Sequence, residues 1–360
     1  MMRETQPIAS AAAAPKVLPL RLEPHEMSKH ISIVGVTGAV GQELLRILEE
    51  RKFPVASLRP LASARSAGKT IQFRGQSIPV QELTRESFQG IDIAFFSAGG
   101  SVSREYAAAA VEAGAIVIDN TSAFRMKPGI PLVVPEVNPQ ALRKHPGLIA
   151  NPNCSTILMN VVVWPLHQKF QVKRIVVNTY QAVSGAGAAG LAELEEQQRA
   201  RVAGEPAKAK LFPHPIVDNL FCHNSAIDDS GCNEEERKMV AETRKIFEAP
   251  DLAISATCVR VPVPRAHCES VNLEFARPVT PQQVREVLAG APGVQLVDHV
   301  EKNTFPMPIL ASGQDDVLVG RIRQDASLPG GRGIDLFLAG DQIRKGAATN
   351  AVQIAERLPQ

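Results

Sequence analysis

Short apolar runs alternate with helical patterns along the first part of the chain. The runs 30–36, 91–96 and 115–119 are rich in β-branched and other apolar residues, which is typical of strands buried on both faces. Residues 42–51 carry leucines at helical spacing and residues 104–113 are rich in alanine, so both segments predict helices. Strands that alternate with helices favour a parallel sheet covered on both faces, and we therefore predict a doubly wound α/β domain.

The pattern changes in the rest of the chain, where the apolar segments become longer. Residues 271–275 alternate apolar and polar side chains, which suits a half-exposed antiparallel strand. An amphipathic helix at 346–358 closes the chain and is expected to dock on the first domain. We predict a first domain at 29–153, completed by a C-terminal helix at 340–360, and a second, α+β domain with a mixed sheet at 154–339. Further strands of the second domain are expected at 175–180, 254–261, 317–322 and 334–338.

The composition is that of an ordinary globular protein, with 44% hydrophobic and 21% charged residues among 360. The net charge is +2 and no long block of Lys and Arg occurs, so we expect no nucleic-acid partner. No apolar run reaches the roughly 18 residues that a membrane helix needs, so we expect no membrane partner either.

The N-terminal residues 1–28 show no strong periodicity and lack the apolar core of a signal peptide. We predict that this segment is a disordered tail and that the protein is cytoplasmic. Two alternatives stay open. One is an organelle transit peptide, against which the glutamates of the tail argue; the other is a translation start at Met27.

Cysteine usage indicates a reducing compartment. The five cysteines are an odd number, and no pair is separated by two residues as in zinc ribbons. We therefore predict free thiols and no metal ion. The alternative is a mixed zinc site, because Cys222 precedes His223 and His267 precedes Cys268.

A glycine-rich turn joins the first predicted strand to the first predicted helix. Gly35, Thr37, Gly38 and Gly41 stand at the spacing G-x-T-G-x-x-G. Such glycines let the backbone approach a pyrophosphate, while the helix N-terminus supplies N–H donors and the positive end of its dipole. The position of the turn favours a Rossmann-type dinucleotide-binding domain; the alternative is a tight turn without a ligand.

The segment after the second predicted strand (58–62) distinguishes the two nicotinamide cofactors. NAD-binding folds place an Asp or Glu there for the ribose 2′-hydroxyl, but residues 61–69 contain no acid. Ser63, Arg65 and Ser66 instead offer donors for an additional phosphate, and Lys69 adds a positive charge. The planar fork of an Arg can bind two phosphate oxygens. We therefore predict NADP as the cofactor; the alternative is a solvated basic loop.

Cys154 stands at the start of a predicted helix, because the largely apolar stretch 157–163 follows the sequence Asn153-Cys154-Ser155-Thr156. A helix N-terminus stabilises a thiolate, so we expect the pKa of this thiol to lie below its ordinary value of about 8.5. Cys154 is therefore the candidate nucleophile; the alternative is a buried structural cysteine.

A thiolate beside a nicotinamide cofactor suggests thioester chemistry. The thiolate adds to an aldehyde, hydride leaves to NADP⁺, and phosphate attacks the resulting thioester. Such catalysis needs a nearby base, for which His267 is the candidate. Arg260 on the same segment can bind a substrate carboxylate. Taken alone, each of these two side chains fits a surface or structural role better.

Several motifs occur in order along the chain, and together they resemble the aspartate-semialdehyde dehydrogenase family of the bacterial type. The likeness covers residues 30–356, nearly everything outside the N-terminal tail. The array is far more specific than any one motif. Its members are 35–41 (GVTGAVG), 62–69 (ASARSAGK), 120–125 (NTSAFR), 134–138 (VPEVN), 151–156 (NPNCST), 180–187 (YQAVSGAG) and 234–239 (EEERKM).

The resemblance implies a role for each site residue. Cys154 would carry the acyl group, Gln181 would orient the substrate or the attacking group, and His267 would be the acid/base. Arg260 would bind the substrate α-carboxylate, and Glu235 its amino group. The phosphate would be held by Arg125, Lys238 and Asn153, and NADP by Thr37, Gly38, Ala39, Val40, Arg65, Ser66, Ser184, Gly185 and Asn350.

The resemblance also implies a reaction: L-4-aspartyl phosphate and NADPH are converted reversibly into L-aspartate 4-semialdehyde, inorganic phosphate and NADP⁺. The reaction belongs to lysine, threonine and methionine (diaminopimelate) biosynthesis, and a homodimer joined through the second domains is expected. A reductase of N-acetyl-glutamyl phosphate is the rival enzyme, but an acetylated amine has no charge for Glu235 to meet. A catalytically silent relative is the rival outside enzymes, but Cys154 and His267 are both present.

Overall fold

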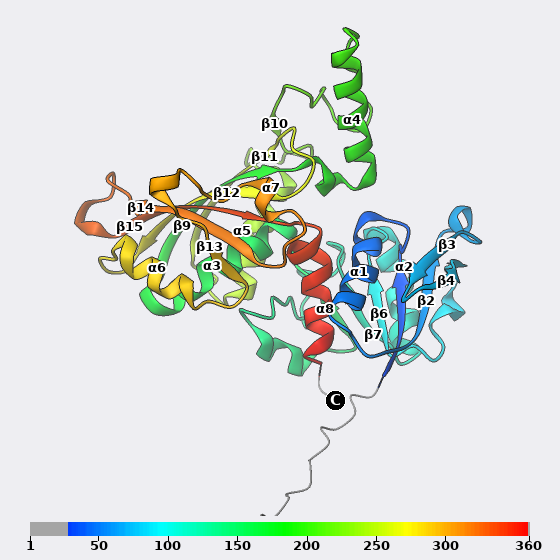
Figure 1. Cartoon of the computed structure of the whole chain (residues 1–360). Coiled ribbons are helices and arrows are strands. Elements are labelled where there is room, and N and C mark those ends of the chain that lie inside the picture. The colour runs from blue at the N-terminus through cyan, green and yellow to red at the C-terminus, as the bar shows by residue number, and fades with distance from the viewer. Residues whose placement is uncertain (1–27, 359–360) are drawn as a thin grey trace, which may run out of the picture.

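The computed structural model of the chain describes residues 28–358 and shows two domains, each built on its own sheet (Figure 1). The predicted tail at 1–28 lies outside the described residues, apart from Ser28. No helix within residues 28–358 is long and apolar enough to cross a membrane.

The first domain contains a six-stranded sheet in the order β5-β2-β1-β6-β7-β8, and every neighbouring pair is parallel. The helices α1 (Ala39–Glu50) and α8 (Thr349–Glu356) pack on one face, and α2 (Gly100–Glu112) packs on the other. This is the predicted doubly wound arrangement. The strands are β1 (Lys29–Val34), β2 (Val55–Ala62), β5 (Gln81–Glu82), β6 (Ile93–Phe96), β7 (Ile116–Asp119) and β8 (Leu148–Ala150), beside a hairpin of β3 (Thr70–Phe73) and β4 (Gln76–Pro79).

The second domain contains a seven-stranded mixed sheet in the order β10-β11-β9-β12-β15-β14-β13, which confirms the predicted fold class. The helices α3 (Cys154–Phe170), α5 (Glu234–Ile246) and α6 (Pro281–Ala289) share one apolar core with this sheet. Figure 1 shows α4 (Ala188–Val202) projecting away from both domains. The strands are β9 (Val172–Gln181), β10 (Phe221–Cys222), β11 (Ala253–Arg260), β12 (His267–Phe275), β13 (Val294–Leu296), β14 (Val317–Gln324) and β15 (Gly333–Gly340), with a short helix α7 (Pro308–Ala311).

The helix α3 runs through the core of the second domain and begins at Cys154. Its residues from Ile157 to Val163, all apolar except Asn160, are buried, because protein surrounds this part of the helix on all sides. Asn153 has extended backbone angles, and its side chain accepts a hydrogen bond from the N–H of Thr156 (3.2 Å). This N-cap fixes the helix start and places the cysteine in the first turn, as predicted.

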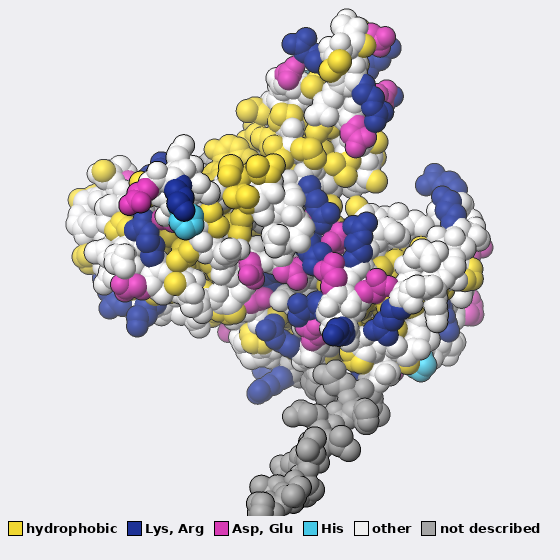
Figure 2. Space-filling view, in the orientation of Figure 1, with side chains coloured by type: hydrophobic (Ala, Val, Ile, Leu, Met, Phe, Trp, Pro, Cys, Tyr) yellow, Lys and Arg dark blue, Asp and Glu magenta, His cyan; other side chains and the backbone are white. Residues whose placement is uncertain are grey.

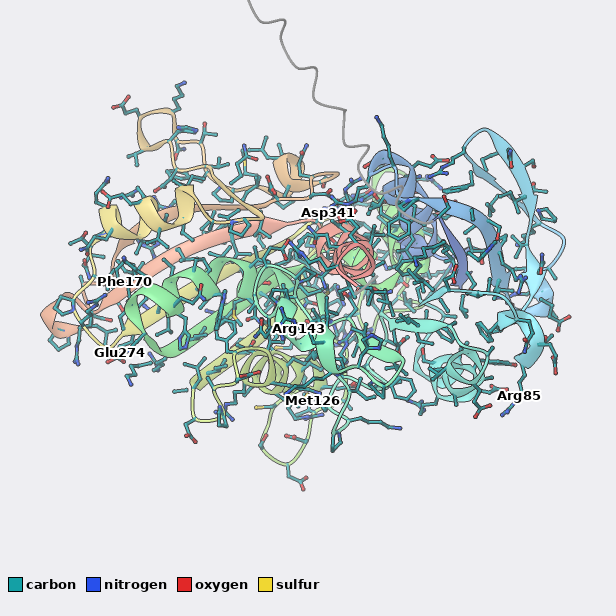
Figure 3. The ribbon with its side chains drawn as sticks, turned by 90° about the horizontal axis from the view of Figure 1, so that it is seen from below. Arg85, Met126, Arg143, Phe170, Glu274 and Asp341 are labelled. Carbon is teal, nitrogen blue, oxygen red and sulfur yellow. The ribbon has the colours of Figure 1, made fainter. Side chains whose placement is uncertain are left out.

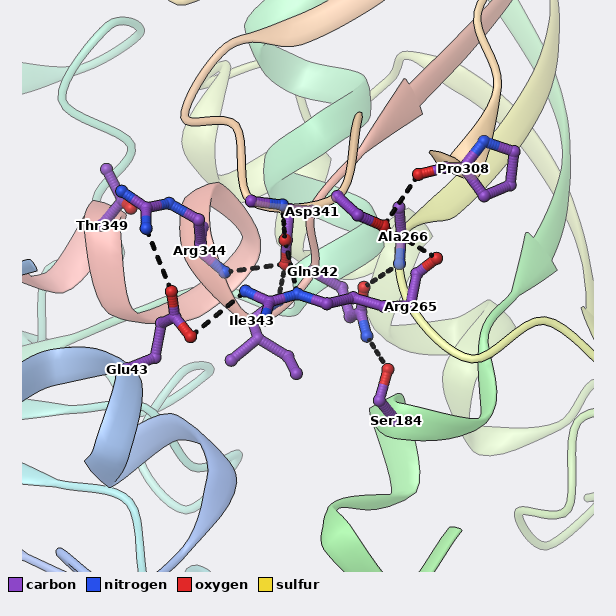
Figure 4. Close-up of polar contacts among 12 residues, drawn as sticks. Glu43, Ser184, Arg265, Ala266, Pro308, Asp341, Gln342, Ile343, Arg344 and Thr349 are labelled. Carbon is purple, nitrogen blue, oxygen red and sulfur yellow. Dashed lines mark hydrogen bonds and ion pairs between the residues drawn. The ribbon is translucent and has the colours of Figure 1, made fainter. Parts of the chain in front are cut away.

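Buried ion pairs fasten the C-terminal segment to both domains (Figure 4). Arg344 contacts Glu43 on α1 at 3.1 Å, and Arg265 of the second domain contacts Asp341 at 2.6 Å. Because breaking a buried pair leaves an uncompensated charge, these contacts hold the domains in one arrangement. Figure 3 shows Asp341 near the middle of the molecule, far from Arg85 at the outer end of the first domain.

The C-terminal helix begins with a π-helical turn, Arg344–Ala348, where an α-helix at 346–358 was predicted. Gly346 lies in this turn, and a Cβ on it would stand 2.9 Å from the Cβ of Cys154. The absence of a side chain at Gly346 therefore lets the turn pack directly against the cysteine. Such π-turns are frequent at functional sites.

Candidate active site

A cavity of about 400 Å³ lies between the two domains at the start of α3. It contains most of the residues that the sequence analysis assigned to catalysis and substrate binding. Side chains that are far apart in the sequence therefore meet at one site. The predicted residues on its lining are Val40, Arg125, Asn153, Cys154, Gln181, Ser184, Gly185, Glu235, Lys238, Arg260 and His267.

Cys154 is half-buried, and its thiol is less acidic than predicted. Burial, and then the negative charge of Glu235, raises the pKa of this thiol to about 12. The charges of Arg125 and Arg260, with the N–H of Ser155, lower the pKa but are outweighed. The prediction that the helix start lowers this pKa is therefore wrong, because the loss of water contact exceeds the effect of the helix terminus.

His267 is the first residue of β12 and is fully buried. Its Nδ1 accepts a hydrogen bond from the backbone N–H of Ala182 (3.0 Å), so the ring hydrogen is on Nε2. Within residues 28–358 no group pairs with Nε2, and a Cβ on Gly185 would lie 3.2 Å from it. Burial, and then the charge of Arg260, holds the pKa of His267 well below its ordinary value, so the ring is a neutral donor at neutral pH.

Glu235 lies in the first turn of α5, where a capping box fixes the helix start. Its Oε1 accepts hydrogen bonds from Asn153 Nδ2 (2.6 Å) and Gln181 Nε2 (3.4 Å). Burial raises the pKa of Glu235, but the charges of Lys238 and Arg125 and the hydrogen bond from Asn153 act in the opposite direction, and the net pKa is lowered. The carboxylate is therefore ionised at neutral pH and brings a negative charge close to the thiol.

Arg125 presents its guanidinium to the cavity with several donors already engaged. Its Nε donates to the carbonyl of Asn151 (2.9 Å), Nη1 to Glu242 Oε1 (3.1 Å) and Nη2 to the carbonyl of Asn120 (2.9 Å). Each Nη carries a second N–H, so a pair of donors remains for an anion. Lys238, partly exposed, lines the same cavity. Two cations are thus available to a phosphate.

Arg260 ends β11, and its guanidinium is almost fully buried against the cavity. Its Nη1 donates to the carbonyl of Ala182 (2.7 Å), and its Nη2 lies 2.8 Å from His223 Nε2. Its Nε is buried and has no partner among the described residues. The guanidinium is therefore held in place yet keeps donors free for a carboxylate.

The residues that line the cavity without having been assigned from the sequence include Gln342 and His223. Gln342 donates to Ser184 Oγ (2.5 Å) and accepts from the N–H of Ala266 (2.9 Å), as Figure 4 shows. His223, considered before only as part of a zinc site, instead contacts Arg260. Both contacts join segments far apart in the chain, so no local pattern signals them; the only hint for Gln342 is its place just after a predicted strand.

The structure does not favour the zinc alternative. Cys222 is exposed, while His223 faces the cavity. His267 and Cys268 are neighbours on β12, so their side chains point to opposite faces of the sheet. Within the part of the chain that the structure describes, no group of three or more His, Cys, Asp or Glu side chains is arranged to hold a metal ion.

A second cavity, of about 530 Å³, opens beside the glycine-rich loop. Gly35 has φ +87°, and a Cβ on Gly41 would lie 2.4 Å from the Gly35 carbonyl oxygen, so only glycines let this loop close. Because Val40 of the same loop lines the first cavity, an extended dinucleotide can reach from one cavity into the other. The predicted cofactor residues on the lining of the second cavity are Thr37, Gly38, Arg65 and Ser66.

Two predicted cofactor residues line neither of these cavities. Ala39 is the first residue of α1. Asn350 is fully buried, and its Nδ2 donates to the carbonyl of Val133 (2.9 Å) and to Asn151 Oδ1 (2.6 Å). Both amide hydrogens of Asn350 are thus used. The side chain supports the wall of the first cavity through Asn151.

Comparison with known proteins gives matches along most of the chain. Residues 30–145 match the sequence model of the semialdehyde dehydrogenase NAD binding domain, and residues 163–345 match that of the semialdehyde dehydrogenase dimerisation domain. The aspartate-semialdehyde dehydrogenase of Synechocystis sp. is 57% identical over 328 residues, which are 91% of this chain and 96% of the relative.

Solved structures agree with this match. Aspartate semialdehyde dehydrogenase II from Vibrio cholerae, complexed with ASA, has a TM-score of 0.89 and 46% identity, with 92% of this chain and 98% of that chain covered. Aspartate semialdehyde dehydrogenase with NADP from Candida albicans has a TM-score of 0.72 and 26% identity, with 92% and 98% covered. The chain therefore belongs to the aspartate-semialdehyde dehydrogenase family, whose members are oxidoreductases that act on an aldehyde group.

Proposed function

We propose that the protein interconverts L-aspartate 4-semialdehyde and L-4-aspartyl phosphate, with NADP as hydride carrier and a thioester on Cys154 as intermediate. The observation that carries this proposal is a single cavity that holds a thiol, an imidazole donor and buried charges of both signs. The reductive direction serves amino-acid biosynthesis, on the route to lysine, threonine and methionine.

Cys154 supplies the nucleophile. Its thiolate adds to the aldehyde carbon, a C–S bond forms, and the carbonyl electron pair moves to oxygen. His267 donates its Nε2–H to that oxygen and stabilises the negative charge in a buried site. Gln181, held by Ser155 at 3.0 Å, orients the adduct beside the sulfur. NADP⁺, held at this site by the loop Thr37–Val40, would supply the hydride acceptor needed to convert the adduct into a thioester.

Arg125 and Lys238 hold the phosphate that completes the oxidative direction. A phosphate oxygen attacks the thioester carbon, the C–S bond breaks, Cys154 leaves as the thiolate, and the proton of the hydrogen phosphate is released. The two cations, with the amide of Asn153, offset the charge that gathers at the reacting centre. Preorganised cations of this kind cost little reorganisation during the reaction.

The substrate changes the charges that act on the thiol. The charge of Glu235 is one cause of the raised pKa of Cys154. A substrate ammonium group that pairs with Glu235 offsets this charge, and the substrate carboxylate binds Arg260. Pairing of the ammonium group with Glu235 therefore lowers the pKa of the thiol, whereas pairing of the carboxylate with Arg260 offsets a charge that lowers it.

NADP is proposed as the preferred cofactor, held by the loop Thr37–Val40 and by Ser184 and Gly185 at the catalytic end. Arg65 is exposed on the lining of the groove, where its guanidinium can bind a 2′-phosphate. Glu82 lines the same groove and would favour a ribose hydroxyl, so removal of Arg65 decides between the two cofactors.

A homodimer joined through the second domains is the proposed assembly. Figure 2 shows hydrophobic side chains gathered on the second domain beside the base of α4. Large apolar side chains exposed in this domain include Tyr180, Leu220 and Ile309. Exposed apolar patches of this kind mark interaction surfaces. Sedimentation equilibrium is expected to give twice the mass of the chain, and a monomer at assay concentration would contradict this assignment.

Initial-rate kinetics test the proposed reaction. The wild-type protein is supplied with L-aspartate 4-semialdehyde, phosphate and either NADP⁺ or NAD⁺, and formation of the reduced cofactor is followed by absorbance. Turnover is expected to require all three components and to favour NADP⁺. N-acetyl-glutamate semialdehyde is expected to be a poor substrate, because its amide offers no charge to Glu235. A preference for this acetylated aldehyde would contradict the proposal.

A further inference from the structure

His223 lies at the edge of the catalytic cavity and contacts Arg260. The antiparallel pairing of β10 with β11 delivers it there: Phe221 lies opposite Arg260, and the N–H of His223 donates to the carbonyl of Cys258 (2.8 Å). These contacts leave His223 Nε2 at 2.8 Å from Arg260 Nη2. The long segment between α4 and α5 thus supplies a side chain to the carboxylate-binding arginine.

The donors and acceptors around His223 fix its tautomer. A guanidinium only donates, so Nε2 accepts from Arg260 and the ring hydrogen is on Nδ1. Nδ1 donates to Ser225 Oγ (3.1 Å), and the same Oγ accepts from the backbone N–H of Glu235 (3.3 Å). In this tautomer the contact of Ser225 N with Nδ1, at 3.3 Å, is not a hydrogen bond. One chain of hydrogen bonds therefore connects Arg260 to the start of α5, where Glu235 stands.

The surroundings of His223 keep its ring neutral, as this chain requires. Burial is the largest cause that lowers the pKa of His223 to about 4, and the charges of Arg260 and Lys238 lower it further. Glu235 and Glu234 on α5 act in the opposite direction but are outweighed. An imidazolium has no acceptor nitrogen, so only the neutral ring can hold the arginine.

We propose that His223 is a positioning residue that holds the guanidinium of Arg260 at a fixed separation from the carboxylate of Glu235. The cavity then selects a substrate that carries both an α-carboxylate and a free α-ammonium group. This inference rests on the proposed function, since it assigns those two groups to Arg260 and Glu235. Both ring nitrogens of His223 are occupied by protein partners, so the ring does not act on the reacting atoms.

The expected loss without His223 follows from the remaining contacts of Arg260. Among the described residues, the carbonyl of Ala182 would be the only hydrogen-bond partner left to the guanidinium, through Nη1, because Nε has none; a cation–π contact with the Phe212 ring, at 5.9 Å, would also remain. The group would then rotate about the hydrogen bond to Ala182. A substrate whose two charged groups are rigidly spaced could no longer meet Arg260 and Glu235 at once.

Kinetics of His223→Ala, His223→Gln and a matched control, His214→Ala, test the proposal. His214 is an exposed residue of the same segment, outside the cavity. In His223→Ala the KM for L-aspartate 4-semialdehyde is expected to rise on the order of tenfold, because a hydrogen bond to a charged group is lost. The kcat and the KM values for phosphate and NADP⁺ are expected to stay within about twofold. His223→Gln, whose carbonyl oxygen accepts from Arg260, is expected to recover most of the loss.

Succinate semialdehyde, which keeps the carboxylate but lacks the ammonium group, provides the second readout. The preference for aspartate semialdehyde over this analogue in kcat/KM is expected to fall in His223→Ala and to stay at the wild-type level in His214→Ala. The inference is overturned if the preference is unchanged in His223→Ala, or if the KM values for aspartate semialdehyde, phosphate and NADP⁺ rise together. It is also overturned if His223→Gln is no more active than His223→Ala. Failure of the wild-type protein to use aspartate semialdehyde would overturn the proposed function instead, and so the two failures are distinguishable.

Discussion

The catalytic cavity and the groove beside the glycine-rich loop are built by different means. In the groove, the backbone of the glycine-rich loop forms part of the lining. A side chain at Gly35 or Gly41 would collide with neighbouring backbone atoms, so both positions need glycine. In the catalytic cavity, charged side chains are held by other buried groups, as Glu242 holds Arg125. The groove therefore depends on a few adjacent residues, whereas the cavity depends on contacts from the whole fold.

Removal of the nucleophile is expected to give the largest difference between the effect on turnover and the effect on cofactor binding. Cys154→Ala is expected to lower kcat by more than roughly 10³-fold, because alanine cannot form the thioester. The Kd for NADPH, measured by fluorescence titration, is expected to change by less than about twofold, since Cys154 does not line the groove. Cys268→Ala is the matched control, because Cys268 is also buried but lies on the face of β12 opposite His267. This variant is expected to keep its turnover. Wild-type turnover by Cys154→Ala would refute the thioester.

The dependence of the cavity on buried partners can be tested at Glu242. This carboxylate accepts from Arg125 Nη1 (3.1 Å) and from the N–H of Asn153 (2.6 Å). Glu242→Ala is expected to lower the free energy of unfolding by about 3–5 kcal/mol, measured by urea denaturation, because it leaves Arg125 buried without its partner. Glu195→Ala breaks an exposed pair with Arg199 and is expected to cost less than about 1 kcal/mol. Similar losses in both variants would contradict the comparison.

In the groove, cofactor binding should depend most on the side chain of Arg65, the proposed contact of the 2′-phosphate. Arg65→Ala is expected to weaken NADPH binding about tenfold or more, because charge-assisted bonds to the 2′-phosphate are lost. NADH binding is expected to stay within about twofold. The control is Lys69→Ala, which removes a nearby exposed charge that does not line the groove. Equal losses for NADPH and NADH in Arg65→Ala would show that this side chain does not read the phosphate.

The smallest expected effect concerns the acidity of the thiol. The charge of Glu235 raises the pKa of Cys154, so the neutral side chain in Glu235→Gln is expected to lower it. The pH profile for alkylation of the thiol by iodoacetamide should then move to lower pH than in the wild type. Glu234→Gln, at the neighbouring residue on α5, is the control and is expected to leave the profile in place. An unchanged pH profile in Glu235→Gln, or a shift to higher pH, would show that the charge of Glu235 does not raise the pKa of Cys154.

Local sequence patterns were sufficient wherever neighbouring residues determine the structure. The run of apolar residues after Cys154 predicted α3, and the spacing of the glycines predicted the βα turn, because both depend on short-range backbone geometry. The π-helical turn at Arg344–Ala348 was missed, since its contact with the cysteine comes from the other end of the chain.

The sequence could not predict pKa shifts that depend on burial, or contacts between segments that are far apart in the chain. The direction of the pKa shift of Cys154 was predicted wrongly, because a helix start is visible in the sequence but the desolvation of the thiol is not. The contact of His223 with Arg260 and the full use of the Asn350 amide depend on pairing between distant segments in the same way. The resemblance to a family supplied the site residues that spacing alone could not assemble.

Trapping the acyl group tests the central claim most directly. The wild-type protein is mixed with L-4-aspartyl phosphate in the absence of NADPH and examined by intact-mass and peptide mass spectrometry. The account predicts one aspartyl group per chain on the peptide that contains Cys154, released by hydroxylamine and absent from Cys154→Ala. An unmodified wild-type chain, or the same adduct on Cys154→Ala, would contradict the thioester at this cysteine.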